Sequence, residues 1–430
     1  MRTHSNSLGG AHVRRWIARG LALVTLMGAI GFGPSNAMAN DDSTALGSTA
    51  ETVLDAAHRL SPSLRAAALD TAAATARADR ADALDDPMLS AQTMQVPGSR
   101  APMDQTTILL QQEFPLWGKL DLRKSKAEAM LDAARGEERG AAAELDEKIK
   151  VAFARYYAAS RASAINTEVI GIAGEMERAT RARYGQALDG QAEALMAEAE
   201  TTNAKIERLH LEGQLRGAAA DLNALLARAP NAALAEPLAL RTLPNPAPNI
   251  DALAERVRSA NPVLFAEAAQ IRGAQSAKEL AQKAWYPDLT LGAGPQTNLG
   301  SVGYTAMVGL KIPLQWGAKE DDEREADANL GAARERLAAS TAEILGELGQ
   351  AVASLAATEQ IDEMRRTELV PQLTASYKSA LAEYATGHAD LSSVLESVHH
   401  LHDTELELLQ VDVEAQSALA LIERLIGGDL

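Results

Sequence analysis

A histidine-rich stretch near the C-terminal end is the first candidate for chemistry. It reads HHLHD and contains His399, His402 and Asp403. On a helix, residues three and four positions apart share a face, so these three side chains would lie together. Two imidazoles and a carboxylate can bind Zn²⁺ or Cu²⁺, and one interpretation is therefore a metal site. The alternative interpretation is a solvated or interhelical patch that binds no metal.

Enzyme signatures are missing from the sequence. It has no phosphate-binding glycine loop, no Gly-x-Ser-x-Gly nucleophile motif and no His-Glu-x-x-His motif. The acidic runs EDDERE (320–325) and LDD (84–86) lack the glycine-containing spacing of a calcium loop, so they indicate solvated faces. These observations predict a protein that is not an enzyme and that uses no cofactor.

The composition indicates long helices. Hydrophobic residues make up 47% of the 430 residues, but aromatic residues make up only 3%. An alanine-rich chain with few aromatic residues is typical of helices packed closely side by side. The formal net charge of −17 argues against nucleic acid as a partner, because nucleic-acid binding needs a basic surface.

The N-terminal segment reads as an export signal. A basic region with Arg14 and Arg15 precedes the apolar run 21–32, which is too short for a standard membrane span. The sequence Ala-Met-Ala ending at Ala39 fits the cleavage rule, so we predict a signal peptide over 1–39 and a mature start at Asn40. The arginine pair also allows a twin-arginine signal, but nothing downstream resembles a cofactor site, which favours general export.

Two further features of the sequence limit the kinds of site and membrane attachment that are possible. The sequence contains no cysteine, which excludes disulfides, thiolate metal sites and lipid attachment to an N-terminal cysteine. No later segment has an apolar run long enough for a membrane helix.

A set of landmark residues recurs in the same order about 200 positions later, which predicts a tandem duplication. The first repeat would span 40–242 and the second 250–430, joined by the proline-rich linker 243–249. The paired landmarks are Pro62 and Pro262, Pro87 and Pro287, Pro115 and Pro313, Tyr184 and Tyr384, and Leu195 and Leu395.

Each half predicts a helix, two short strands and then a very long helix. The helix that begins at 119 runs to about 184 without a proline, which is roughly 95 Å of helix. Alternation around Tyr304 and Val308 predicts a half-buried strand. The remaining predicted elements are helices over about 50–84, 251–283 and 394–426 and strands over 88–96, 106–114, 288–294 and 304–312.

The predicted strands suggest a membrane. They are about nine residues long, near the length that crosses a bilayer as tilted β-structure. Four strands cannot close a barrel, and an open sheet edge is not stable in lipid. If the strands span a membrane, three copies would supply a 12-stranded barrel, an even number within the bacterial range.

Aromatic residues lie just outside the predicted strands. Aromatic residues at both ends of short strands are typical of the interface belt of a membrane barrel. The alternative is that these rings pack a small soluble β-domain. The proposed interface residues are Phe114, Trp117, Trp285, Tyr286 and Trp316.

Four motifs carry a resemblance to a known family. Each half has a strand-to-helix junction, QQEFPLWGKL and VGLKIPLQWGAK, and a hairpin motif, YGQALDGQAEAL from Tyr184 and YATGHADLSSVL from Tyr384. With the duplicated element order, the mature chain resembles outer-membrane efflux proteins of the TolC family. The spelling QEFPxxGKL is most similar to the CzcC-like heavy-metal efflux branch.

The resemblance implies a mainly α fold with a small β part. Each duplicated protomer would have four transmembrane strands and long coiled-coil helices. A homotrimer would form a 12-stranded barrel in the outer-membrane lipid and an α-helical barrel in the periplasm.

The resemblance also implies a passive duct in a tripartite efflux pump. The implied partners are a periplasmic membrane-fusion adaptor and an inner-membrane pump of the resistance-nodulation-division type, and the implied cargo is heavy-metal cations. Drugs or other organic substrates are an alternative cargo. A periplasmic coiled-coil adaptor or scaffold is the alternative of another class.

Finally, the resemblance implies roles for residues in the two hairpins. The channel gate would include Tyr384, Glu396 and Glu193, although Glu396 could instead lie on the outer wall or pair with a neighbouring helix. The sequence departs from the family pattern at Ala187, in the usual glycine place, and at Ser393, where an acidic residue is common. The tips that would contact the adaptor contain Tyr184, Ala187, Asp189, Gly190, Gly387 and Asp390.

Overall fold

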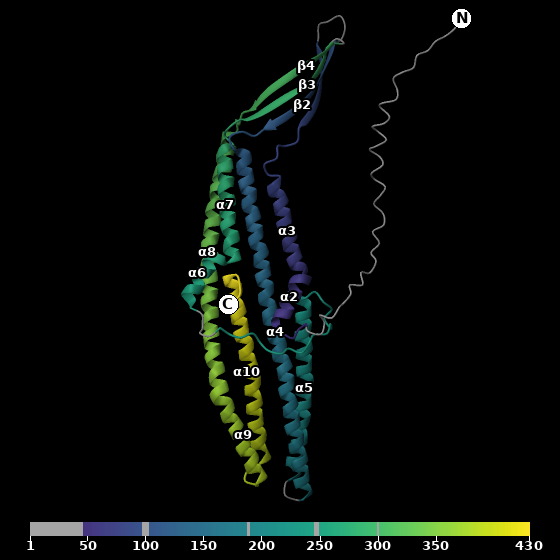
Figure 1. Cartoon of the computed structure of the whole chain (residues 1–430), viewed down its shortest axis with the longest axis vertical. Coiled ribbons are helices and arrows are strands. Elements are labelled where there is room, and N and C mark those ends of the chain that lie inside the picture. Colours follow the sequence, from purple (N-terminus) through teal and green to yellow (C-terminus); the bar gives the residue numbers. More distant parts are fainter. Residues whose placement is uncertain (1–45, 97–102, 187–189, 245–248, 299–300) are drawn as a thin grey trace, which may run out of the picture. The chain divides into compact units, whose positions relative to one another are not determined.

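Helices and strands follow one another in the same order in both halves of the chain (Figure 1). The computed structural model describes residues 46–96, 103–186, 190–244, 249–298 and 301–430, which belong to one unit. The proposed signal peptide 1–39 and mature start Asn40 lie outside the described residues, as do Ala187, Asp189 and part of the linker 243–249.

The first half contains α2 (Ala50–Leu60), α3 (Pro62–Asp79), β1 (Met88–Val96), β2 (Met103–Phe114), α4 (Lys119–Gly185) and α5 (Gln191–Leu225). The second half contains α6 (Ile250–Ala260), α7 (Pro262–Lys283), β3 (Asp288–Asn298), β4 (Ser301–Lys311), α8 (Trp316–Met364), the π-helical segment η2 (Arg365–Leu369), α9 (Val370–Ala385) and α10 (Leu391–Ile426). The predicted strand 88–96 and the start of the helix at 119 are confirmed.

The two predicted helices that precede the strands are each broken in two. The breaks fall at the buried residues Ser61 and Asn261, which occupy the N-cap position of the following helix, and a proline occupies its first position. The Asn261 side chain accepts hydrogen bonds from the N–H groups of Val263 and Leu264. The prediction of single helices over 50–84 and 251–283 is therefore wrong, because a proline ring excludes the backbone hydrogen bond that would continue the helix.

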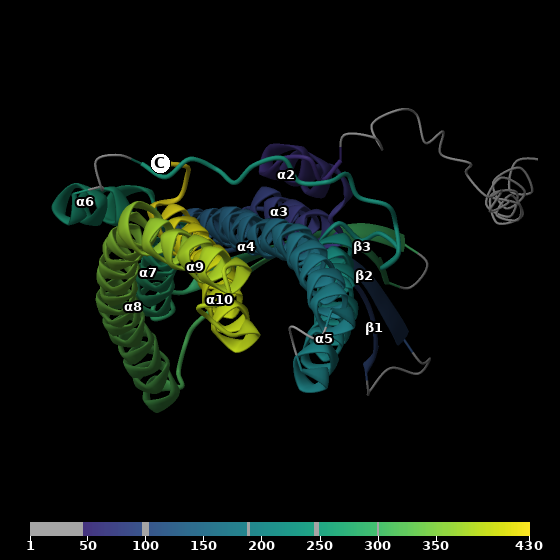
Figure 2. The same ribbon diagram turned by 90° about the horizontal axis from the view of Figure 1, so that it is seen from below.

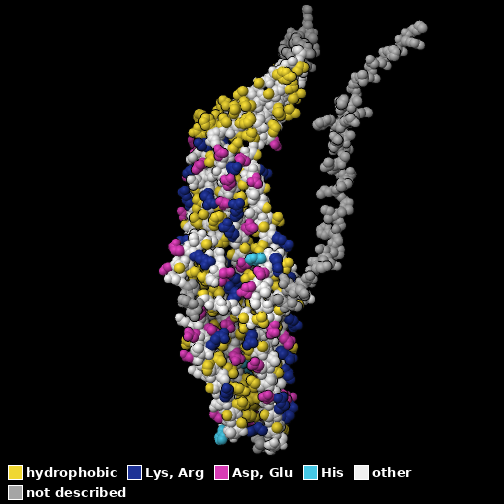
Figure 3. Space-filling view, in the orientation of Figure 1, with side chains coloured by type: hydrophobic (Ala, Val, Ile, Leu, Met, Phe, Trp, Pro, Cys, Tyr) yellow, Lys and Arg dark blue, Asp and Glu magenta, His cyan; other side chains and the backbone are white. Residues whose placement is uncertain are grey.

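The four strands form one antiparallel sheet in the order β1-β2-β3-β4. The register places Leu89, Leu110, Leu291 and Val308 on one face. Figure 3 shows hydrophobic side chains gathered over the sheet, whereas charged side chains are spread over the helices. The other face carries polar residues and glycines such as Gln111, Thr305 and Gly309.

The alternation predicted for β4 is present, and its apolar side chains are the exposed ones. Tyr304 is 89% exposed and Val308 73% exposed, whereas Thr305 and Met307 on the opposite face are partly covered. Alternation in a sequence identifies two faces but does not say which face meets the protein interior.

The long helices lie side by side as a curved wall, which Figure 2 shows end-on. α4 packs against α3 and α7 near the sheet and against α5 and α10 farther from it. The largest apolar clusters lie where the short helices α2 and α6 cover this wall, around Phe153 and Leu222 in the first half and Leu348 and Ile422 in the second. None of the described helices is long and apolar enough to cross a membrane.

A π-helical turn joins α8 to α9. It lies just before Pro371, which has no N–H to donate to the preceding turn. Arg366 in this turn holds both carboxylate oxygens of Asp412 in α10, at 2.8 and 3.0 Å. Burial raises the pKa of Asp412 despite this guanidinium partner.

Buried charges fix the C-terminal end against the wall. Lys150 of α4 binds Glu423 at 2.8 Å and Asp429 at 2.5 Å, and Arg241 binds the same Glu423 at 2.8 Å. The Lys150 and Glu423 side chains are only 6% and 5% exposed. Each buried charge is thus neutralised by a partner, as burial of an ionised group requires.

Candidate channel wall, junction and hairpin tips

The first junction motif is built around a buried lysine. Gly118 takes a positive φ of 75° and precedes α4, which begins at Lys119. The Lys119 ammonium donates to both carboxylate oxygens of Asp288 at 2.8 Å and to the Tyr286 carbonyl at 2.9 Å. The N–H of Leu116 donates to the same carboxylate at 3.1 Å. This network connects the end of the first β-hairpin to the beginning of the second β-hairpin.

Aromatic rings surround this junction. Trp117 donates its indole N–H to the Pro287 carbonyl at 2.9 Å and lies against the Tyr286 ring with centroids 5.2 Å apart. Trp285 donates its indole N–H to Glu323. Trp117 is 52% exposed and Trp316 is 64% exposed.

The predicted belt residues all lie at one end of the sheet rather than at both. Phe114 ends β2, Tyr286 precedes β3, and Trp316 follows β4, so all belong to the end that meets the helices. The reason is topological, because both hairpins start and finish on that side. The prediction that these residues flank both ends of the strands is therefore wrong, and their role at an interface stays a prediction.

The second hairpin tip has the backbone that its sequence suggests. Gly387 takes a positive φ of 76°, where an L side chain is strained, although space around its Cα is open. Asp390 caps α10 by accepting hydrogen bonds from the Ser393 N–H at 3.1 Å and hydroxyl at 2.6 Å. These bonds lower the pKa of Asp390, with the bond from the Ser393 hydroxyl as the main cause. Ser393 thus serves the cap where the family pattern has an acidic residue.

The first hairpin tip is only partly described. Tyr184 is 46% exposed near the end of α4, and Gly190 lies in an extended conformation before α5. Ala187 and Asp189 lie outside the described residues.

Tyr384 connects the two helical hairpins, α4–α5 and α9–α10. Its hydroxyl lies 3.0 Å from that of Thr180 in α4, both groups are buried, and the Arg183 guanidinium lies 5.1 Å from its ring centroid. Met176 and Leu391 pack in the same apolar cluster. The residue that the resemblance assigns to a gate is therefore a contact between α4 and α9.

The two predicted gate carboxylates lie near the tips. Glu396 has a 75% exposed side chain, and its nearest basic partner is His400 at 3.8 Å. Glu193 lies in the first turn of α5 and is partly exposed.

The histidine cluster does not gather around a metal position. The His399 ring lies 3.2 Å from Glu200 of α5, whereas His402 lies 3.6 Å from Asp403. No group of three or more His, Asp or Glu side chains in the described part of the chain is placed to hold a metal ion. The contact of His399 with Glu200 in α5 fits the alternative interpretation, an interhelical patch.

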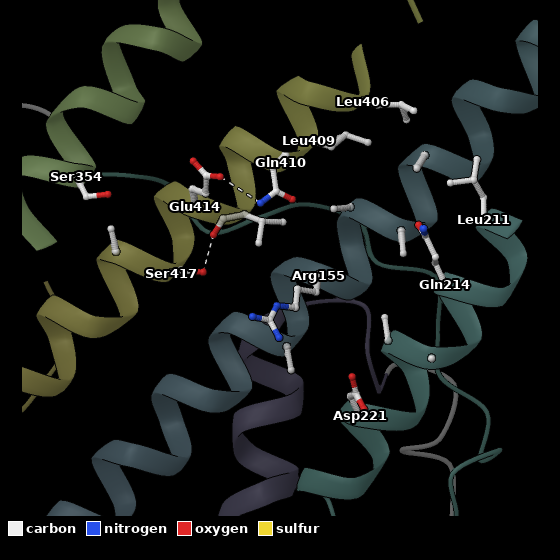
Figure 4. Close-up of a pocket in the computed structure, with 18 of the residues that line it drawn as sticks. Arg155, Leu211, Gln214, Asp221, Ser354, Leu406, Leu409, Gln410, Glu414 and Ser417 are labelled. Atoms are coloured by element: carbon white, nitrogen blue, oxygen red, sulfur yellow. Dashed lines mark hydrogen bonds between the residues drawn. The ribbon is translucent and has the colours of Figure 1, made fainter. Parts of the chain in front are cut away.

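A large cavity opens on the wall between the two hairpins (Figure 4). Its volume is about 1120 Å³, and α4, α5, α8 and α10 all contribute to its lining. Arg155, Asp221 and Glu414 supply charge, and Gln410 donates to Glu414 at 3.2 Å. Small residues such as Ala159 leave the surface between these polar groups open.

The sequence did not reveal the partner of Lys119 at the first junction or the partner of Tyr384 near the second hairpin tip. The sequence predicts Lys119 only as the first residue of a helix, and it gives no sign that Thr180 contacts Tyr384. No local pattern marks Lys119 as buried, and its partner Asp288 lies 169 positions away.

Comparisons with known proteins show which fold this is. Residues 253–428 match the family model described as Outer membrane efflux protein. The second half of the chain matches that family. The match runs from α6 through α10, and the first half repeats the same element order. The description is that of a transport protein, which agrees with the prediction that the chain is not an enzyme.

Solved structures show the same fold over almost the whole chain. The outer membrane protein VceC from Vibrio cholerae is 21% identical with a TM-score of 0.76, covering 88% of this chain and 96% of that one. CusC is 15% identical with a TM-score of 0.78, covering 94% and 96%. The Neisseria gonorrhoeae MtrE outer membrane channel is 15% identical with a TM-score of 0.74, covering 89% of each chain. A comparison with curated protein sequences gives no match. The predicted fold class, mainly α with a small β part, is confirmed.

Proposed function

We propose that this protein is the outer-membrane channel of a tripartite efflux pump and that three copies form it. The observation that carries the proposal is the four-stranded sheet with one apolar and one polar face. Apolar-out and polar-in alternation is typical of membrane β-barrels. In lipid, every backbone polar group must be paired within protein, so the edges β1 and β4 need partners.

A neighbouring copy supplies those partners in the simplest way. The β4 edge of one protomer would pair with the β1 edge of the next, and three such contacts close a ring of 12 strands. The helical walls would then enclose a tunnel, with their concave faces inward. A periplasmic scaffold or adaptor, the alternative class, would have no use for an apolar sheet face.

The assembly can be tested with engineered cysteines, because the sequence contains none. A cysteine at Ser90 in β1 would be combined in turn with Gly303→Cys, Thr305→Cys and Met307→Cys in β4. We expect at least one pair to give covalent trimers upon oxidation in membranes. Each single variant is the control and should give no covalent trimer. A stable detergent-solubilised monomer with no crosslinking at any position would contradict the proposal.

The hairpin carboxylates are proposed to form the periplasmic gate. An α-helix repeats its direction every 18 residues, and Glu396 lies 18 positions before Glu414, which lines the cavity of the wall. Glu193 stands in the same relation to Leu211. Both carboxylates therefore belong to the helix faces that would face the tunnel.

Three Glu396 side chains near a constriction would focus negative potential. We expect Glu396→Gln to reduce the cation selectivity of single channels in planar bilayers and to weaken block by divalent cations added from the periplasmic side. Glu368→Gln, an exposed carboxylate of η2, is the control. An unchanged reversal potential and unchanged block would refute the gate role and make Glu193 the next residue to test.

The cargo and partners belong to the same proposal. The sequence QEFPxxGKL at the first strand-to-helix junction supports heavy-metal cations as cargo. Drugs or other organic substrates are the second candidate. The tips around Gly387 would contact a periplasmic membrane-fusion adaptor. An inner-membrane pump of the resistance-nodulation-division type would be the third component of the assembly. Deleting the gene and measuring sensitivity to metal salts and to drugs in parallel separates the two cargo classes.

A further inference from the structure

A second cavity lies on the wall between the first one and the sheet. Its volume is about 790 Å³, and α3, α4, α7 and α8 contribute to its lining. These four helices are neighbours in that order, each packed against the next. A cavity that reaches from α3 to α8 must therefore lie on the concave side of this row.

One stripe of α4 lines both cavities. Arg123, Lys126 and Glu137 face the upper cavity, and Arg155 and Ala159 face the lower one. Glu137 and Arg155 are 18 positions apart, which is five helical turns, and Arg123 and Ala159 are separated by ten turns. The two cavities are thus successive sections of one inner face.

The opposite side of α4 has other contacts. Asp146 lies nine positions after Glu137 and therefore on the opposite face of α4, where it binds His58 of α2 at 2.5 Å. Lys150 binds the C-terminal segment. The concave side is therefore the one that these covering elements leave open.

The two sections differ in the sign of their charge. The upper cavity is lined by the cations Arg77, Arg123, Lys126 and Arg336 and by two carboxylates, those of Asp70 and Glu137. In the lower cavity, the single cation Arg155 faces the carboxylates Glu207, Asp221 and Glu414. The upper section is thus basic in a protein whose formal net charge is −17.

The four upper cations are not neutralised by the protomer itself. Among the residues that the structure describes, none of the four lies within salt-bridge distance of a carboxylate. Nearby acids are engaged by other cations, since Asp82 binds Lys124 at 2.7 Å and Asp132 binds Arg272 at 2.9 Å. Their positive potential is therefore available to solutes in the cavity.

We propose that this cluster of Arg77, Arg123, Lys126 and Arg336 is a binding collar for polyvalent anions in transit, directly below the sheet. The proposal rests on the proposed channel, since only in the trimer do three such clusters face one tunnel. A cleft lined by one sign of charge raises the local concentration of the opposite ion. Guanidinium groups bind phosphate-like and carboxylate anions through two parallel hydrogen bonds. Anions inside the tunnel would then be concentrated at this site, between the acidic lower section and the sheet.

The test compares Arg123→Gln/Arg336→Gln with the matched control Lys205→Gln/Arg258→Gln, which removes two cations that line neither cavity. Binding of inorganic tripolyphosphate to the detergent-solubilised protein would be measured by calorimetry at low salt. We expect the collar variant to bind about two- to thirty-fold more weakly, the range for two exposed ionic contacts, and the control to bind as the parent does. Arg123→Lys/Arg336→Lys keeps the charge and should retain most of the binding, which guards against a folding defect.

Planar bilayers separate this inference from the proposed function. Under a salt gradient, the collar variant should shift its reversal potential toward cation selectivity, and tripolyphosphate should block the parent channel but not the variant. If the protein forms channels whose reversal potential and block are the same in parent and variant, the collar is refuted and the channel stands. If no channels form at all, the proposed function fails, and equal tripolyphosphate binding by parent and variant would refute the collar as well.

Discussion

Replacing Gly136 with alanine tests how closely the two halves of the wall approach each other. A Cβ on Gly136 would lie 2.7 Å from the Cβ of Ala266 in α7 and 3.0 Å from its Cα. Unstrained carbon atoms pack at about 3.5–4.0 Å, so the two helices must separate by several tenths of an ångström. Such overpacking costs about 1–3 kcal/mol of unfolding free energy.

Gly140 provides the matched control one turn later in the same helix. A Cβ there would meet nothing within 4 Å. Both substitutions gain the same helix propensity, about 1 kcal/mol, so that term cancels between them. We therefore expect Gly140→Ala to be more stable than Gly136→Ala by about 1–3 kcal/mol.

Guanidinium unfolding of the detergent-solubilised protein, followed by far-UV circular dichroism, measures this difference. Gly140→Ala should move the midpoint up, and Gly136→Ala should move it down or leave it near the parent value. Equal upward shifts in the two variants would refute the close approach of α4 to α7.

Three further outcomes follow from the junction and the tips. Lys119→Met should cost about 3–5 kcal/mol, because it leaves the Asp288 carboxylate without its buried cation, and Lys119→Met/Asp288→Leu should recover part of that loss in the same unfolding assay. Tyr384→Phe should weaken the contact with Thr180 by about 1–3 kcal/mol, and single-channel recordings should show a larger open fraction; an unchanged open fraction would count against a gate at this contact. Gly387→Val should impair efflux while leaving membrane insertion intact, because a β-branched residue is strained at this positive φ, whereas Gly387→Asn should be tolerated; equal efflux by both would argue against the assigned turn.

Elements whose limits are local in the sequence could be predicted. Pro87 and Pro115 bracket the first hairpin, and the strand predicted at 88–96 matches β1. The helix breaks at Ser61 and Asn261 were missed, because alanine-rich periodicity continues across them and only the proline signals the stop. For β4 the sequence showed two alternating faces but not their surroundings, since a period of two is the same for a face that meets a core and one that meets lipid.

Contacts between the halves could not be read from the sequence at all. The buried pairs between Lys119 and Asp288 and between Thr180 and Tyr384 join positions 169 and 204 residues apart. The duplication itself hides them, because the position that matches Asp288 in the first half is Met88, which cannot bind a lysine. Such contacts depend on how the two repeats diverged after they became one chain.

The open four-stranded sheet also has a genetic consequence. In the proposed trimer, each copy contributes one third of the ring, so one defective copy leaves two edges unpaired and spoils the whole channel. If parent and defective chains are made in equal amounts and mix at random, only about one trimer in eight contains three intact copies. Variants that damage the edges β1 or β4 but still bind a neighbour should therefore be dominant over the parent allele, whereas variants that prevent folding of the single chain should be recessive.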